Sequence, residues 1–76
     1  MRIREIREAL RRQPFHPFDI QLADGREFAI EHVEFLLISR IERSFVVATL
    51  KGGYEIIDPV MVTSLSISNA IADSGG

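Results

Sequence analysis

Histidine and carboxylate side chains come closest to a reactive cluster near the middle of the chain. His32 lies between Glu31 and Glu34, a combination that could bind a metal ion weakly or relay a proton. In an extended strand, successive side chains point to opposite faces, so these three groups do not converge on one ion. His16 stands in the segment FHPF, between an aromatic residue and a proline. We therefore predict solvated or hydrogen-bonded histidines and no metal site.

Serine and glycine residues lack the neighbours that catalysis needs. A nucleophilic serine or cysteine requires a base beside it, yet the chain has no cysteine, and no histidine lies near its serines in sequence. Gly52 and Gly53 are adjacent, lie between predicted strands and do not open a helix, as a phosphate-binding loop would. We predict no catalytic residue and no cofactor, and expect a protein that is not an enzyme.

Arginine is concentrated at the start of the chain. Five arginines and two glutamates give residues 1–13 a charge of +3, whereas the remaining residues carry −5. Arg4, Arg7 and Arg11 recur at helical spacing, and Arg12 follows them. Two interpretations remain open: a solvated face whose Arg–Glu pairs support a helix, or a basic stripe that follows the phosphates of a nucleic acid.

The elements that must position these residues begin with a helix. Ile3, Ile6 and Leu10 are spaced as on one helical face, and Pro14 cannot continue the helix. This pattern predicts a helix over residues 2–13. The segment FHPF then forms an extended connector, whose phenylalanines we expect to anchor the helix to the rest of the domain.

Two alternating stretches around a glycine-containing turn predict a β-hairpin. A three-residue loop over residues 23–25 places Ile20 opposite Phe28, whereas a two-residue loop would pair apolar with charged residues. The pattern therefore predicts the three-residue loop, with Gly25 in the left-handed conformation of a bulge.

The rest of the chain reads as further strands. The second strand is predicted to run on through HVEFLLIS as one long, bent strand, because no breaker interrupts it. A second hairpin follows, with its turn at residues 51–53, and a last strand ends at Ile67. Val46, Ala48 and Leu50 make the outer face of this second hairpin apolar as well. A closed barrel or an oligomer interface must then cover that face.

Together these elements predict the fold class: mainly β with an N-terminal α-helix, in a five-stranded antiparallel small barrel of the SH3-like or Sm-like kind. We expect residues 1–76 to form a single domain, with the barrel over residues 18–67 and a flexible tail over residues 69–76. A hydrophobic content of 46% indicates a core, and a chain this short without cysteine often gains stability by self-association. No apolar run suits a signal peptide or a membrane span, so we expect a cytoplasmic protein with no membrane partner.

Two segments of the sequence resemble the Sm-like family. FDIQLADGREFAI resembles the opening hairpin of the bacterial Sm-like RNA chaperone Hfq, and SFVVATLKGGYEIIDPVMVTSLSI resembles its third to fifth strands. FHPF, LADGR, EF and YEIIDPVMVTSLSI also resemble a group of short uncharacterised bacterial proteins, which implies no activity. The Sm-like resemblance implies a ring of identical subunits, in which the fourth strand of one subunit pairs with the fifth strand of its neighbour. Hfq ends its fourth strand in a Tyr-Lys-His signature that meets uridines, and the matching residues 54–58 here keep only Tyr54.

Two functions remain open at this point. We favour an oligomeric interaction or assembly module of unknown ligand, with a second copy or another protein as partner. Its predicted oligomer edge consists of Tyr54, Ile56, Ile57, Val62, Leu65 and Ile67. The alternative is an RNA-binding ring that uses the basic helix. Its predicted nucleic-acid-binding residues are Arg4, Arg7, Arg11, Arg12, Phe35 and Tyr54.

Overall fold

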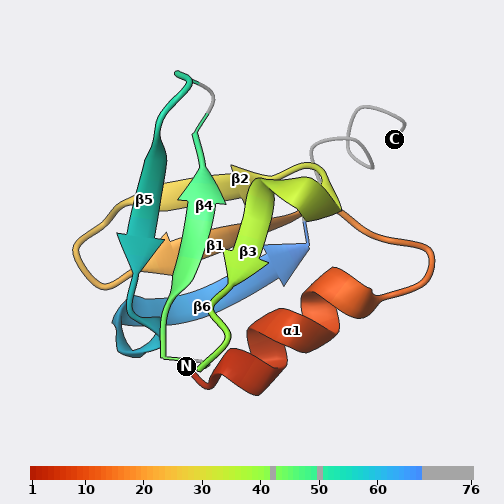
Figure 1. Ribbon diagram of the computed structural model, residues 1–76, viewed down its shortest axis with the longest axis horizontal. Coiled ribbons are helices and arrows are strands. Elements are labelled where there is room, and N and C mark those ends of the chain that lie inside the picture. Colours follow the sequence, from red (N-terminus) through yellow and green to blue (C-terminus); the bar gives the residue numbers. More distant parts are fainter. Residues whose placement is uncertain (42, 50, 68–76) are drawn as a thin grey trace.

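The N-terminal helix forms where the spacing of its apolar residues predicts it. The computed structural model describes residues 1–41, 43–49 and 51–67, and helix α1 covers Ile3–Arg11 (Figure 1). Ile6 is fully buried, and Ile3 and Leu10 pack against the core from the same side. The backbone is already extended at Arg12, just before the proline that ends the helical pattern. The predicted helix is confirmed apart from its terminal residues.

The first sheet contains β1 (Phe18–Leu22), β2 (Glu27–Ile30) and β6 (Val62–Ile67). Its strands are antiparallel in the order β2-β1-β6, so β6 is an outermost strand. Burial alternates along β1 as the sequence pattern requires, because every second side chain points into the core.

The turn of the first hairpin has the predicted geometry. Ile20 lies opposite Phe28, and Phe18 lies opposite Ile30. Gly25 has a φ of 94°, a conformation that glycine adopts without steric cost. The three-residue loop and its register are therefore confirmed.

The second sheet contains β3 (Leu36–Ile38), β4 (Phe45–Ala48) and β5 (Tyr54–Ile57). These strands are also antiparallel, in the order β3-β4-β5, so β5 is an outermost strand. The predicted second hairpin is confirmed, with Gly52 at a φ of 92° in its turn. Leu50 and the predicted tail over residues 69–76 lie outside the described residues.

The predicted long second strand is wrong. A short 3-10 helix, Val33–Phe35, separates β2 from β3. A continuous strand would point His32 and Glu34 to the same side as Ile30 and Leu36, both of which are buried. Because burying an imidazole and a carboxylate without partners is costly, the chain leaves the sheet and keeps both exposed.

The predicted five-stranded closed barrel is corrected as well. The described residues form six strands in two separate three-stranded sheets, whose backbone hydrogen bonds do not join into a barrel. In Figure 1 the strands of the second sheet run across those of the first, and α1 lies below both. A second short 3-10 helix, Pro59–Met61, connects β5 to β6. The broader prediction, a mainly β fold with one N-terminal helix, is confirmed.

The core lies where the inner faces of the two sheets and one face of the helix meet. Phe15 in the connector contacts Phe18 edge-on, with 6.1 Å between the ring centroids, so the segment FHPF does anchor the helix to the first sheet. The largest fully buried side chains come from all three elements of the fold: Ile6, Phe18, Ile20, Ile30, Phe45 and Val47.

Candidate assembly surface

The second sheet is apolar on both faces. Its inner face buries Phe45 and Val47 completely. On the outer face, Leu37 on β3 lies beside Val46 on β4, which lies beside Ile56 on β5. We call this outer surface the apolar face, and it consists of Leu37, Val46, Ala48, Tyr54 and Ile56. The sequence-based expectation of an apolar second face is thus confirmed for its described residues.

The apolar face is open to solvent. The exposed fractions are 70% for Leu37 and 76% for both Tyr54 and Ile56. A shallow hollow of about 320 Å³ lies on this face, where Phe35 and Glu34 border it. Large apolar side chains that share one exposed surface mark sites where another molecule binds.

Both sheets also end in an unpaired strand. Within the described residues, the outer edges of β5 and β6 have no neighbouring strand. Soluble proteins usually protect such edges with lysine, proline or a covering element. Strand β6 has the sequence VTSLSI, without a charge or a proline, and β5 has a single charge at Glu55. The two edges are therefore suited to pairing with a further strand.

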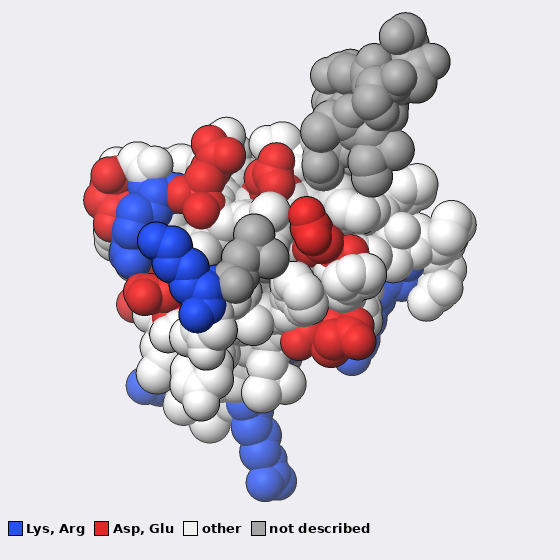
Figure 2. Space-filling model, turned by 90° about the horizontal axis from the view of Figure 1, so that it is seen from above, with Lys and Arg blue, Asp and Glu red and all other residues white. Residues whose placement is uncertain are grey.

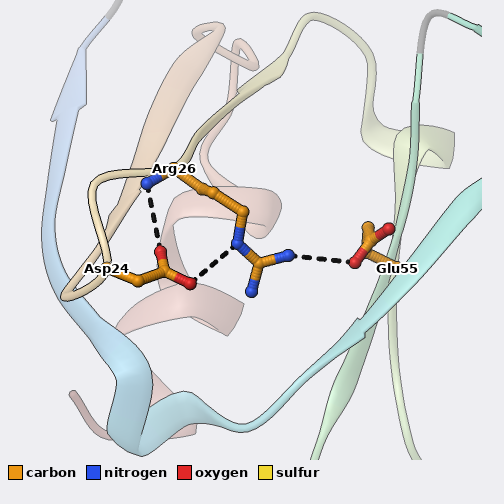
Figure 3. A network of polar contacts seen from close by, with 3 residues as sticks. All are labelled: Asp24, Arg26 and Glu55. Atoms are coloured by element: carbon orange, nitrogen blue, oxygen red, sulfur yellow. Dashed lines mark hydrogen bonds and ion pairs between the residues drawn. The ribbon is translucent and has the colours of Figure 1, made fainter.

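The charge on β5 is neutralised within the chain. Arg26 Nη1 donates to Glu55 Oε1 at 3.1 Å, and Arg26 Nε donates to Asp24 Oδ2 at 2.9 Å (Figure 3). The backbone N–H of Arg26 also donates to Asp24 Oδ1 at 3.1 Å. This backbone hydrogen bond, aided by the guanidinium, lowers the pKa of Asp24. Arg26 thereby links the turn of the first hairpin to β5 and reduces the electrostatic cost of a partner strand at that edge.

The residues of the predicted oligomer edge fall into two groups. Tyr54 and Ile56 are exposed, Leu65 is half-buried, and Ile67 is 44% exposed. In contrast, the side chains of Ile57 and Val62 are buried in the core, so only their backbone groups can take part in an edge contact.

The helix contributes a second feature, a groove between α1 and β3 with a volume of about 470 Å³. We call it the basic groove, because three arginines and an aliphatic wall line it. The lining residues are Arg7, Leu10, Arg11, Val33, Leu36, Leu37, Ile38, Ser39 and Arg40.

The structure divides the predicted nucleic-acid-binding residues between two places. Arg7 and Arg11 line the basic groove, whereas the exposed Arg4 and Arg12 are not among its lining residues. Phe35 and Tyr54 lie on the other side of Leu37, in the hollow of the apolar face. Leu37 lines both depressions, so the basic groove and the apolar face adjoin each other.

Sequence analysis did not select Leu37 or Arg40 as functional residues. A local signal existed for Leu37, because a three-residue apolar strand such as LLI must turn at least one side chain to the outer face. For Arg40 the sequence carries no local signal, because its place in the groove depends on how α1 packs beside β3.

The outer face of the first sheet has the opposite character. Asp19 lies opposite Ala29 on β2, with Glu27 and Glu31 near it. Burial, together with the negative charge of Glu27 and Glu31, raises the pKa of Asp19. Figure 2 shows acidic side chains spread over the molecule as seen from above, on the side of β2.

The histidines and serines have ordinary structural surroundings. His32 is exposed and contacts Phe35 edge-on at 5.3 Å between centroids, and His16 is exposed as well. Ser39 Oγ accepts from the backbone N–H groups of Arg43 and Ser44. Ser64 Oγ donates to the side-chain oxygen of Gln21. Among the described residues, no group of three or more histidine, cysteine or acidic side chains is placed to hold a metal ion.

No protein-family model, curated protein or solved structure matches this chain. In the part of the chain that the structure describes, no helix has the length and apolar character needed to cross a membrane.

Proposed function

We propose that this protein is a non-enzymatic, Sm-like interaction module that acts by assembling with copies of itself. In the assembly, β5 of one copy pairs with β6 of the next, so that each copy uses both of its unpaired edges. The order of contacts is heterologous, and a closed ring is the arrangement that leaves no edge exposed.

The strand order supports an Sm-like arrangement. If β2 and β3 are taken as one interrupted strand, the two sheets follow each other as β6-β1-β2 and β3-β4-β5. An N-terminal helix precedes them, and a short turn joins the two outermost strands. This is the element order that the sequence resemblance implies, with the second strand interrupted.

The observation that carries the proposal is the apolar face. A chain of this size has a small core, and exposing three large apolar side chains on one sheet reduces its solubility. Because the apolar face extends up to the β5 edge, a partner strand at that edge would bring further protein surface over Tyr54 and Ile56. Backbone pairing and burial of apolar surface would then contribute to the same interface.

The test is size-exclusion chromatography with light scattering on the purified protein, at two salt concentrations. We expect a mass of several chains that changes little with salt, because backbone pairing and apolar burial are screened weakly. A monomer at micromolar protein concentrations under both conditions would disprove the proposal.

A second candidate function is RNA binding by the same assembly. The observation that favours it is the adjacency of the basic groove and the hollow with Phe35 and Tyr54, across Leu37. Arginines could hold phosphates there while a base stacks on an aromatic ring next to them. In the same chromatography, the ratio of absorbance at 260 nm to that at 280 nm reports bound nucleic acid. We expect an elevated ratio at low salt that falls at high salt if this function holds.

A further inference from the structure

The basic groove has a chemistry that the pairing of strand edges does not explain. Its wall is aliphatic, and its cations come from Arg7 and Arg11 on the helix and from Arg40 after β3. Among the described residues that line it, no carboxylate balances these charges and no aromatic ring offers a surface for stacking a base. The groove is therefore complementary to a segment that is acidic and aliphatic rather than to a nucleobase.

A segment with this chemistry is present on the chain itself. Residues 54–60, YEIIDPV, include three of the most exposed large apolar side chains of the described chain: Tyr54 and Ile56 at 76%, and Val60 at 75%. The same segment contains the carboxylates of Glu55 and Asp58 and has no lysine or arginine. We call residues 54–60 the acidic segment.

The acidic segment is held in a fixed shape in the free chain. Asp58 Oδ1 accepts from the backbone N–H of Val60 at 3.0 Å, and the N–H of Met61 donates to the carbonyl of Asp58 at 2.9 Å. Pro59 is buried beneath this turn, so Val60 projects from a rigid support. A segment that is already ordered loses little conformational entropy on binding.

The two surfaces lie on different sides of the molecule. In Figure 1, β5 is at the left of the second sheet, whereas β3 is the strand of that sheet nearest to α1. The strand β4 separates β3 from β5, so a copy does not fill its own groove with its own acidic segment. Contact between the two surfaces requires a second copy.

We propose that the basic groove of one copy binds the acidic segment of a second copy. Arg11 and Arg40 would then face the carboxylates of that segment, and Val60 would enter the aliphatic wall of the groove. The proposal rests on the self-assembly proposed above and adds the charged contact that fixes the order of the copies. Because the contact is heterologous, each copy uses its groove on one side and its acidic segment on the other.

The decisive experiment mixes two variants of opposite charge. Arg11→Glu/Arg40→Glu reverses the charge at the exposed rim of the groove, and Val60→Lys adds a cation to the acidic segment of the other protein. Arg7 is left unchanged because it is half-buried. We expect each variant alone to assemble with a dissociation constant raised at least tenfold, as light scattering over a concentration series would show. In an equimolar mixture the glutamate groove can receive the lysine segment, and the arginine groove can receive the native one, so assembly is restored.

Val60→Glu is the matched control, because it removes the same apolar side chain but keeps the sign of the segment. We expect it to assemble with a dissociation constant within about threefold of that of the native chain, since a carboxylate still suits the arginines. Equal loss of assembly in Val60→Glu and Val60→Lys would show that apolar burial alone matters, and would overturn the proposal. Circular dichroism and thermal melts of every variant establish that each is folded.

The remaining outcomes separate this proposal from the self-assembly on which it rests. If Arg11→Glu/Arg40→Glu assembles like the native chain, self-assembly holds and the groove contact is wrong. If that variant keeps its mass but loses bound nucleic acid, the groove is an RNA site and the proposal is again overturned. If the native chain is itself monomeric, both proposals fail.

Discussion

The two sheets bury similar inner faces but present opposite outer faces. Phe18 and Ile20 fill the core from the first sheet as Phe45 and Val47 do from the second. The outer face of the first sheet is acidic around Asp19. The outer face of the second sheet is aliphatic and aromatic. Since both sheets already supply their share of the core, folding does not require the apolar face, and its composition indicates a role in binding.

The charges follow the same division. The acidic side chains are prominent on the side of β2, whereas the helix and the end of β3 bring arginines to the basic groove beside the second sheet. A cationic groove next to an apolar face provides both specificity and burial for a partner, because charges fix orientation and apolar area supplies most of the stabilisation. The first sheet offers neither, and its polar outer face suits contact with water.

Replacing a residue on the inner face of the second sheet should have the largest effect on folding. Phe45→Ala removes a fully buried aromatic ring, and we expect the free energy of unfolding to fall by about 3–5 kcal/mol, enough to unfold much of a small domain. Val46→Thr changes the next residue of the same strand, on the half-buried outer face. It should cost less than about 1 kcal/mol, as urea denaturation would measure. A similar loss of stability in the two variants would contradict the division into a core face and a binding face.

Local signals in the sequence predicted the helix and both hairpins. The spacing of Ile3, Ile6 and Leu10 indicated the buried side of α1, and the alternation around Gly25 fixed the register of the first hairpin. Such features depend on residues that are near one another in sequence, where turn chemistry and periodicity determine the backbone.

The interruption of the second strand and the basic groove were not predicted. His32 and Glu34 could have signalled the interruption, because a continuous strand would have pointed both into the core. The groove depends on packing between α1 and β3, which are far apart in sequence, and the helical stripe does not indicate which strand it meets. For the same reason the arginine spacing predicted a basic face but not the contribution of Arg40.

The hairpin turns should be equally sensitive in the two sheets, with an effect smaller than that of a core residue. Gly25 and Gly52 both have φ above 90°, and a Cβ added at either position meets nothing within 4 Å. Gly25→Ala and Gly52→Ala should therefore each cost about 1–2 kcal/mol through backbone conformation alone. Gly53→Ala is the control, because its Cβ would lie 3.7 Å from Thr49 Oγ1, an ordinary contact, without the positive φ. A loss of stability at Gly53 equal to that at Gly52 would contradict this explanation.

The smallest expected effect concerns the acidic face of the first sheet and depends on pH. The pKa of Asp19 is raised in the folded protein, so its ionisation is disfavoured there, and stability falls as pH rises from the unfolded pKa through the folded one. Asp19→Asn should therefore be slightly more stable than the native chain at neutral pH, by less than about 1 kcal/mol, and the gain should vanish in acid. Asp24→Asn should behave in the opposite way. Because the pKa of Asp24 is lowered, its ionised form stabilises the fold above the unfolded pKa, and that contribution is lost as pH falls through the folded pKa. Thermal melts between pH 3 and pH 7 would measure both; the same sign of change in the two variants at neutral pH would show that the acidic face carries no unbalanced charge.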